Sequence, residues 1–137
     1  MISPLEKPRF LIFSLSLNRM TELIACLFEG EGTRKHVLKL IESEEWEKVL
    51  LITDEQNKNG FPQTKNTEFV VIAVDTHLSD MIEEIKQDIN QKIVGPEVGL
   101  NMISGSGKVH MAVLSALLKS GFGIRLVALT KDGVREV

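Results

Sequence analysis

The sequence predicts a three-layer α/β sandwich built on a mostly parallel sheet of five or six strands, with a short antiparallel strand at the C-terminus. Two observations carry this prediction. From Met20 onward, short apolar runs alternate with segments of helical periodicity, the order expected of parallel sheets with helices on both faces. The apolar runs are also nearly continuous, as strands covered on both faces require. A chain of 137 residues is long enough for one such Rossmann-like domain.

The first half of the chain is expected to form two strands, one helix and a long loop. The run at 21–28 predicts the first strand, and Thr33 after it is expected to cap a helix that ends near Trp46. The second strand is expected at 48–53. The polar segment 54–68 contains Asn-Gly and Phe-Pro turn signals, so it predicts a surface loop, the only long connection.

The second half is expected to form three strands, at 69–74, 98–103 and 124–129. Apolar residues at helical spacing predict a helix that stops before Gly95-Pro96 and another that Gly121 ends. The face of the latter helix that packs on the sheet is expected to carry Val109, Ala112, Val113, Ala116 and Leu117. An Asp132-Gly133 turn then leads into the antiparallel tail.

The composition is that of an ordinary globular protein, with 43% hydrophobic and 26% charged residues. A net charge of -3 gives no basic footprint for duplex nucleic acid, so no duplex partner is expected. The single cysteine, Cys26, excludes a disulfide within the chain and predicts a buried residue of a cytoplasmic protein. No apolar run approaches the length of a membrane-spanning helix, so no membrane partner is expected.

Residues 1–19 are expected to be an N-terminal appendage or an extra edge strand, and residues 20–137 the domain itself. The apolar stretch 9–17 resembles a short signal peptide, but Glu6 precedes it and no small-residue cleavage pattern follows. A third interpretation is a start upstream of the native one.

Two glycine-containing loops, at 28–36 and 104–110, each connect the end of a strand to a helix. In open α/β sheets, ligands bind beyond the carboxyl ends of the strands, where the strand order reverses. If the order is 3-2-1-4-5, the first and fourth strands are neighbours at this point. The two loops would then face each other across one crevice, which predicts a ligand site there.

The first loop, GEGTRK from Gly30, begins like the glycine fingerprint of dinucleotide-binding domains, and Asp54 ends the second strand at about the expected distance. Lys35 stands where the fingerprint needs its third glycine, and Glu31 would place a negative charge beside a pyrophosphate. These departures argue against an NAD-type site, which stays an alternative beside a plain glycine turn.

The second loop, SGSGK from Ser104 to Lys108, resembles a nucleoside-triphosphatase P-loop only in part. Met102 stands where that motif needs glycine, and Val109 where it needs the serine or threonine that holds Mg²⁺. Glycines let a ligand approach the backbone, a helix start offers free amides, and Lys108 adds a point charge. The loop is therefore expected to contact phosphate, the alternative being a flexible turn with a solvated lysine.

The three histidines, His36, His77 and His110, lack the spacing of metal ligands and have no cysteine cluster beside them. No metal is therefore expected. His36 and His110 are candidates to line the crevice, the alternative being ordinary polar helix residues.

The segment 100–118, LNMISGSGKVHMAVLSALL, resembles the signature of CARF domains, the CRISPR-associated Rossmann-fold ligand sensors. The likeness consists of a strand containing Leu-Asn, then Ser-Gly-x-x-Lys, then an apolar helix. It extends over most of the chain from Met20. Ser106-Gly107 stands where many relatives carry other small or polar residues.

The resemblance implies a homodimer whose paired clefts bind a cyclic oligoadenylate, and no cofactor is expected. The ligand contacts would come from residues of both loops: Gly30, Gly32, Thr33, Ser104, Gly105, Ser106, Gly107 and Lys108. Some relatives cleave the ring by letting a ribose 2′-hydroxyl attack the adjacent phosphate, for which Lys108 and Thr33 would be the catalytic candidates. Most relatives append an effector domain, whereas this sequence ends at Val137, so it is expected to be either a fragment or a stand-alone sensor, which could be a ring nuclease or a sequestering regulator.

The competing hypothesis is a non-catalytic α/β regulatory or assembly module whose loops are only connections. A positive groove lined by both loops would favour the cyclic-nucleotide site, and a flat or acidic surface would favour the module. An NAD-type domain would instead show one deep cleft with Asp54 at its floor.

Overall fold

The computed structural model describes residues 22–64 and 66–137, so the appendage expected at 1–19 lies outside the described residues. The described residues form a six-stranded sheet in the order β3-β2-β1-β4-β5-β6. The strands are β1 (Glu22–Cys26), β2 (Lys48–Thr53), β3 (Thr67–Val71), β4 (Glu97–Asn101), β5 (Gly123–Thr130) and β6 (Gly133–Glu136). Neighbouring strands run parallel except β5 and β6, so the predicted fold class and strand order are confirmed.

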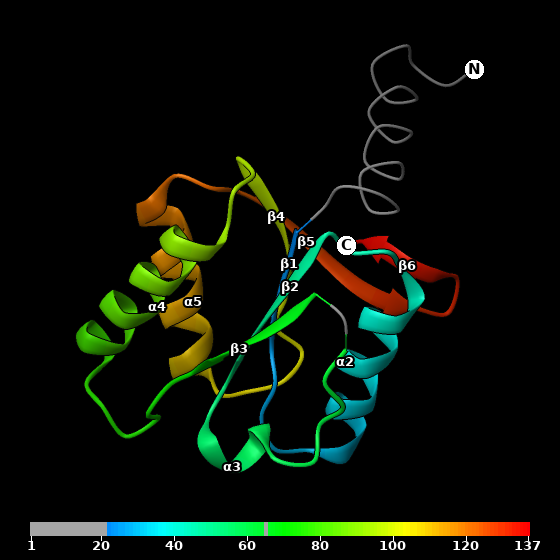
Figure 1. Ribbon diagram of the computed structural model, residues 1–137, viewed down its shortest axis with the longest axis horizontal. Coiled ribbons are helices and arrows are strands. Elements are labelled where there is room, and N and C mark those ends of the chain that lie inside the picture. The colour runs from blue at the N-terminus through cyan, green and yellow to red at the C-terminus, as the bar shows by residue number, and fades with distance from the viewer. Residues whose placement is uncertain (1–21, 65) are drawn as a thin grey trace.

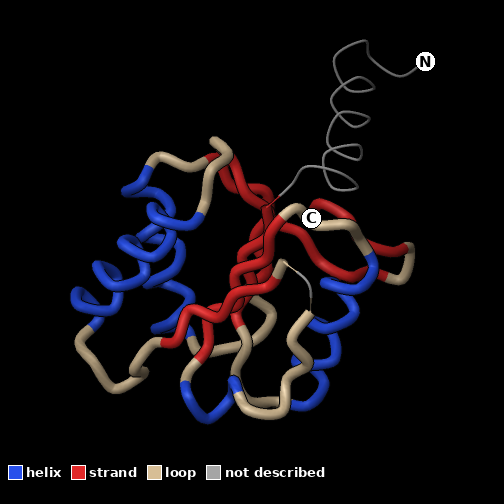
Figure 2. The backbone as a smooth tube through the Cα atoms, viewed as in Figure 1, coloured by secondary structure: helices blue, strands red, loops and turns tan. Residues whose placement is uncertain are grey.

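Helices cover both faces of the sheet (Figure 1, Figure 2). The helix α2 (Glu31–Ser43) lies on one face, and α4 (Leu78–Lys92) and α5 (Gly107–Ser120) pack together on the other. A single turn, α3 (Glu55–Lys58), follows β2. Because the first five strands are parallel, the loops that follow β1 to β4 all emerge at the same edge of the sheet, the carboxyl edge.

Alternate residues of β1 and the two residues after it pack into two separate hydrophobic cores, because successive side chains of an extended segment point to opposite faces. The residues facing α4 and α5 are Ile24, Cys26 and Phe28, and those facing α2 are Leu23, Ala25 and Leu27. The central strand is thus buried on both faces, which explains its continuous apolar run. The five core positions predicted for α5 are all buried. Gly121 ends that helix in the left-handed region with φ 79°, as predicted.

The prediction that Thr33 caps α2 is wrong. The helix begins at Glu31 and its N-cap is Gly30, whose φ of 108° is readily available only to glycine. Thr33 lies inside the first turn, where its hydroxyl donates back to Gly30 O at 3.0 Å. The helix also ends at Ser43, before Trp46, whose indole Nε1 donates to Leu40 O at 3.0 Å.

The predicted surface loop 54–68 contains ordered structure. Asp54 caps α3 with its carboxylate, and β3 already begins at Thr67 rather than at residue 69. β3 ends at Val71, three residues before the end of its apolar run. β4 likewise ends at Asn101, where the side-chain Oδ1 accepts the Ile103 amide at 3.2 Å and turns the chain out of the sheet.

Candidate functional site

The strand order reverses between β1 and β4, and the loops that follow these two strands meet there. The two strands pair in parallel, with Ala25 opposite Asn101. A pocket of about 390 Å³, called the switch pocket below, opens at this edge, and its size suits a small molecule. Residues that follow four parallel strands line it: Phe28, Glu29, Asp54, Asn57, Val74, Gly105, Ser106 and Val109. Of the predicted ligand contacts, Gly105 and Ser106 belong to this lining.

Ser104 ties the two loops together. Its hydroxyl oxygen accepts a hydrogen bond from the Phe28 backbone amide at 2.8 Å, across 76 positions of the sequence. Ser104 is only 1% exposed, so its side chain lies behind the surface of the switch pocket and is not part of the lining. An unsatisfied buried amide costs about 1–3 kcal/mol, so this bond holds the β1–α2 loop against the β4–α5 loop.

Gly105 brings the backbone close to two side chains. Its φ is +109°, and a Cβ there would lie 3.0 Å from Phe28 Cδ2 and 3.2 Å from His110 Nε2. The His110 Nε2 atom lies 2.8 Å from Ser104 O, and it carries the proton of this bond because a carbonyl only accepts. Both the backbone angle and the packing therefore require glycine at this position.

Ser106 and Gly107 begin α5 at the mouth of the switch pocket. The Ser106 hydroxyl caps the helix by accepting the Val109 amide at 3.3 Å. A Cβ at Gly107 would meet nothing within 4 Å, so the space beside the first helical residue is open. The first amides of a helix have no partner within it and attract anions. This end of the pocket can therefore receive an anionic or carbonyl oxygen.

The glycine loop after β1 lies next to the switch pocket, but Gly30, Gly32 and Thr33 are not among its lining residues. A Cβ at Gly32 would meet nothing within 4 Å, so packing within the protein does not require glycine at this position. Lys35 instead forms an exposed ion pair with Glu31 at 3.3 Å. Lys35, which stands where the fingerprint needs its third glycine, thus has an exposed side chain.

Lys108 reaches toward the connection between β3 and α4. Its Nζ atom donates to Val74 O at 3.0 Å and also to Thr76 O. An ammonium group has three donors, so one N–H stays available to a ligand or water. Val74 lines the switch pocket, and Lys108 therefore supports a wall of the pocket from outside its lining.

Five of the lining residues were not predicted as ligand contacts from the sequence: Phe28, Glu29, Asn57, Val74 and Val109. Asn57 is buried in α3 because Asp54 Oδ1 accepts its backbone amide at 2.7 Å and its Nδ2 at 2.8 Å. The signal that could have found this turn is an aspartate at the end of a strand, a preferred N-cap residue.

A second polar group lies at the same reversal point, against α2. Asn101 Nδ2 donates to Val127 O at 2.9 Å. His36 Nε2 accepts the Leu129 amide at 3.3 Å and lies 3.4 Å from Asn101 Nδ2. Because two donors point at one ring nitrogen, His36 is the neutral imidazole, and burial lowers its pKa below the usual value.

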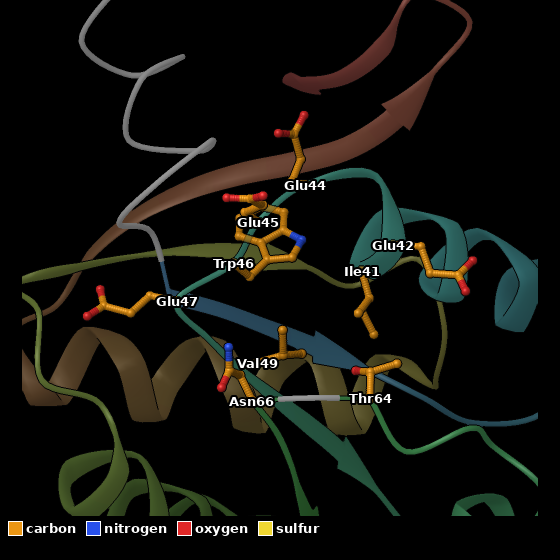
Figure 3. A pocket seen from close by; sticks show the side chains of 9 residues that line it. All are labelled: Ile41, Glu42, Glu44, Glu45, Trp46, Glu47, Val49, Thr64 and Asn66. Carbon is orange, nitrogen blue, oxygen red and sulfur yellow. The ribbon is translucent and has the colours of Figure 1, made fainter.

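A larger pocket, about 670 Å³, lies at the opposite edge of the sheet around Trp46 (Figure 3). Four carboxylates are spread around it: Glu42, Glu44, Glu45 and Glu47. Burial raises the pKa of Glu44, and the charge of Arg135 opposes this shift. Within 22–64 and 66–137, no group of three or more His, Cys, Asp or Glu could hold a metal ion.

No protein-family model matches the chain, and no curated protein shows significant similarity to it. No helix of the described segments is both long and apolar enough to cross a membrane. The chemistry available at the switch pocket comes from three kinds of group. These are the amides that begin α5, the carboxylates of Glu29 and Asp54, and an apolar wall of Phe28, Val74 and Val109.

Proposed function

We propose that this chain is a cytoplasmic, homodimeric CARF-like protein that binds a cyclic oligoadenylate at the switch pocket in CRISPR signalling. One observation carries the proposal: the loops after β1 and β4 line a single pocket where the strand order reverses. Ligands of open α/β sheets bind at this place. The segment that resembles the CARF signature supplies Gly105 and Ser106 to this pocket.

A phosphate of the ligand would lie against Ser106 and the first amides of α5. The open space beside Gly107 lets the phosphate approach the backbone. Lys108 begins the same turn and keeps one N–H beyond its two bonds to carbonyl oxygens. The amides and the Lys108 ammonium offset the negative charge of Glu29 and Asp54 only near the start of α5, so the phosphate is expected there.

The outer face of α5 supports the homodimer. Met111, Leu114 and Leu118 are exposed and repeat at positions i, i+3 and i+7, which places them on one face of the helix. Exposed apolar stripes are typical of interfaces. Because α5 starts at the switch pocket, pairing of two α5 helices would place both pockets at one dimer, as a ring with repeated units requires.

Light scattering after gel filtration tests the dimer. We expect twice the chain mass of 15.3 kDa for the wild type and the single chain mass for Leu118→Lys. Val94→Lys is the matched control, since Val94 is 90% exposed and lies outside α5. A monomeric wild type, or a Leu118→Lys dimer, would contradict this interface.

Cleavage of the ring would break one P–O5′ bond. The ribose 2′-hydroxyl would attack the adjacent phosphorus, leaving a 2′,3′-cyclic phosphate at one end and a 5′-hydroxyl at the other. The catalytic candidates, Lys108 and Thr33, now donate to backbone carbonyls. Thr33 would have to exchange its carbonyl for the phosphate in order to act, whereas Lys108 has one further N–H to offer, so we propose binding first and cleavage as its extension.

Incubation with cyclic tetra-adenylate and cyclic hexa-adenylate, followed by chromatography, tests both the binding of the ring and its cleavage. Micromolar binding is expected, and Lys108→Ala should weaken it. Lys119→Ala is the matched control, because Lys119 is a lysine at the other end of α5. Absence of binding by both ligands would refute the proposal, and binding without new products would remove the nuclease activity alone.

One observation favours the second candidate, a non-catalytic regulatory or assembly module. The described lining of the switch pocket holds the carboxylates of Glu29 and Asp54 and contains neither lysine nor arginine. An acidic surface disfavours a ligand with many phosphates. This candidate predicts no binding of either cyclic oligoadenylate together with the intact dimer in light scattering.

A further inference from the structure

Residues 73–76, called the strap here, connect the end of the apolar run of β3 to His77, the N-cap of α4. Val74 of the strap lines the switch pocket, and it also lines a second pocket of about 460 Å³ together with Ala73. The Val74 side chain is 43% exposed. Because open space adjoins Val74 in both pockets, packing alone does not fix the position of the strap.

Lys108 ties the strap to α5. Among the described residues, the only hydrogen bonds that join the strap to the rest of the molecule come from the Lys108 Nζ atom, which donates to Val74 O at 3.0 Å and to Thr76 O. The other bonds of the strap are internal, since the Thr76 amide and hydroxyl both donate to Ala73 O, at 3.4 Å and 2.9 Å. The strap therefore stays beside the start of α5 as long as the Lys108 side chain keeps this conformation.

Holding the strap and holding a phosphate require the same ordered conformation of the Lys108 side chain. An ammonium group has three N–H donors, of which two reach the strap. Lys108 is the second residue of α5 and follows Gly107, beside which the space is open. A phosphate there can use the third donor while both carbonyls keep theirs. Ordering a lysine side chain costs conformational entropy, and whichever partner is held first has already met that cost for the other.

We infer that Lys108 couples ligand binding at the switch pocket to closure of the strap, because one ammonium group holds the strap carbonyls and a phosphate of the ligand together. The identity of the ligand rests on the proposed function. The coupling rests on the two bonds to the strap and on the place of Lys108 in the first turn of α5. Coupling is reciprocal, so loosening the strap must weaken ligand binding. The expected loss of affinity is about threefold to tenfold, which is what one hydrogen bond contributes.

Calorimetric titration with cyclic tetra-adenylate measures the coupling through a residue that does not hold the ligand. Thr76→Gly removes the hydroxyl bond to Ala73 O and frees the strap backbone, so the affinity should fall by that factor. Thr130→Gly is the matched control, because the Thr130 hydroxyl also donates to a carbonyl three residues away, in the turn between β5 and β6, and the affinity should stay unchanged.

A double-mutant cycle shows whether the effect of the strap passes through the ammonium group. In the Lys108→Met background, Thr76→Gly should cause no further loss of affinity for the ring. An unchanged affinity in Thr76→Gly alone, or an equal loss with and without Lys108, overturns the inference.

Backbone NMR relaxation separates this inference from the proposed function, with the amides of Val74 and Thr76 as reporters of the strap. Without ligand, Lys108→Met should lower the order parameters of these amides, whereas Lys119→Met, at the other end of α5, should not. Saturating cyclic tetra-adenylate should raise the order parameters in the wild type and leave them low in Lys108→Met. Equal order parameters in ligand-free wild type and Lys108→Met would contradict the inference.

Inorganic pyrophosphate serves as a second probe of the same amides. If no ring binds but pyrophosphate raises the order parameters in the wild type and not in Lys108→Met, the proposed function fails and this inference stands. If the ring binds and the order parameters stay as they were, this inference fails and the proposed function stands. If neither the ring nor pyrophosphate binds, both are refuted.

Discussion

Replacing Ser104 with alanine should loosen the loop that follows β1 without disturbing the sheet itself. The mutation leaves the buried Phe28 amide without its acceptor, which lies 2.8 Å away in the wild type. The penalty for an unsatisfied buried donor is about 1–3 kcal/mol, and the small cavity left by one oxygen adds little to it. The expected loss is about 2 kcal/mol of the free energy of unfolding, a large fraction of the 5–15 kcal/mol typical of a domain.

Urea unfolding followed by tryptophan fluorescence measures this loss, because Trp46 is the only tryptophan. The midpoint should fall while the slope stays constant, since the surface exposed on unfolding does not change. Ser79→Ala, at an exposed position of α4, is the control and should change stability by less than about 0.5 kcal/mol. Hydrogen exchange of the Phe28 amide should quicken in Ser104→Ala alone. An unchanged midpoint together with an equally protected Phe28 amide would refute the reasoning.

Three further predictions use other residues of the site. Gly105→Ala should lower the free energy of unfolding by about 1–3 kcal/mol, because φ is +109° and the new Cβ would lie 3.0 Å from a carbon of the Phe28 ring. Gly107→Ala is the control and should not lower the free energy of unfolding, because its Cβ would meet nothing within 4 Å. Thermal melting of the two variants compares them. Burial lowers the pKa of His36, so below about pH 6.5 the unfolded chain binds more protons than the folded chain does. The contribution of neutral His36 to the free energy of unfolding is therefore complete above about pH 6.5 and is lost as the pH falls below that value. Urea titrations should show a flatter pH profile in His36→Gln than in the wild type. Burial raises the pKa of Cys26 to about 12, so a thiol reagent at pH 8 should react only as fast as the chain opens, and rapid labelling of the native protein would contradict the buried position.

The sequence predicted those parts of the fold that depend on local apolar periodicity. The runs that became β1 and β2 are nearly continuous because alternate residues pack into the two cores, whereas β4 adds Val98 and Leu100 to one core alone. Helix α5 was placed correctly with all five of its core positions because its apolar residues repeat at helical spacing. The strand order was considered only as the common 3-2-1-4-5 order of doubly wound sheets, which is a property of the fold class and not of any residue.

The candidate site was predicted only in outline, because its details depend on contacts between distant residues. Lys108 looked free in the sequence, yet its partners Val74 and Thr76 lie more than thirty positions earlier. Ser104 looked like a ligand contact, but its hydroxyl is buried against Phe28. The polarity of a short loop does not tell whether a side chain faces a ligand or another loop.

The bond between Ser104 and Phe28 also has a consequence for the order in which a growing chain can fold. During synthesis, β1 and β2 emerge well before β4, so one side of β1 has no neighbouring strand until residues 97–101 have been made. The Phe28 amide gains its hydrogen-bond acceptor only after Ser104, 76 residues later, has been made. An unpaired apolar strand of this kind invites association with other chains. A nascent chain that stalls before residue 104 is therefore expected to need a chaperone.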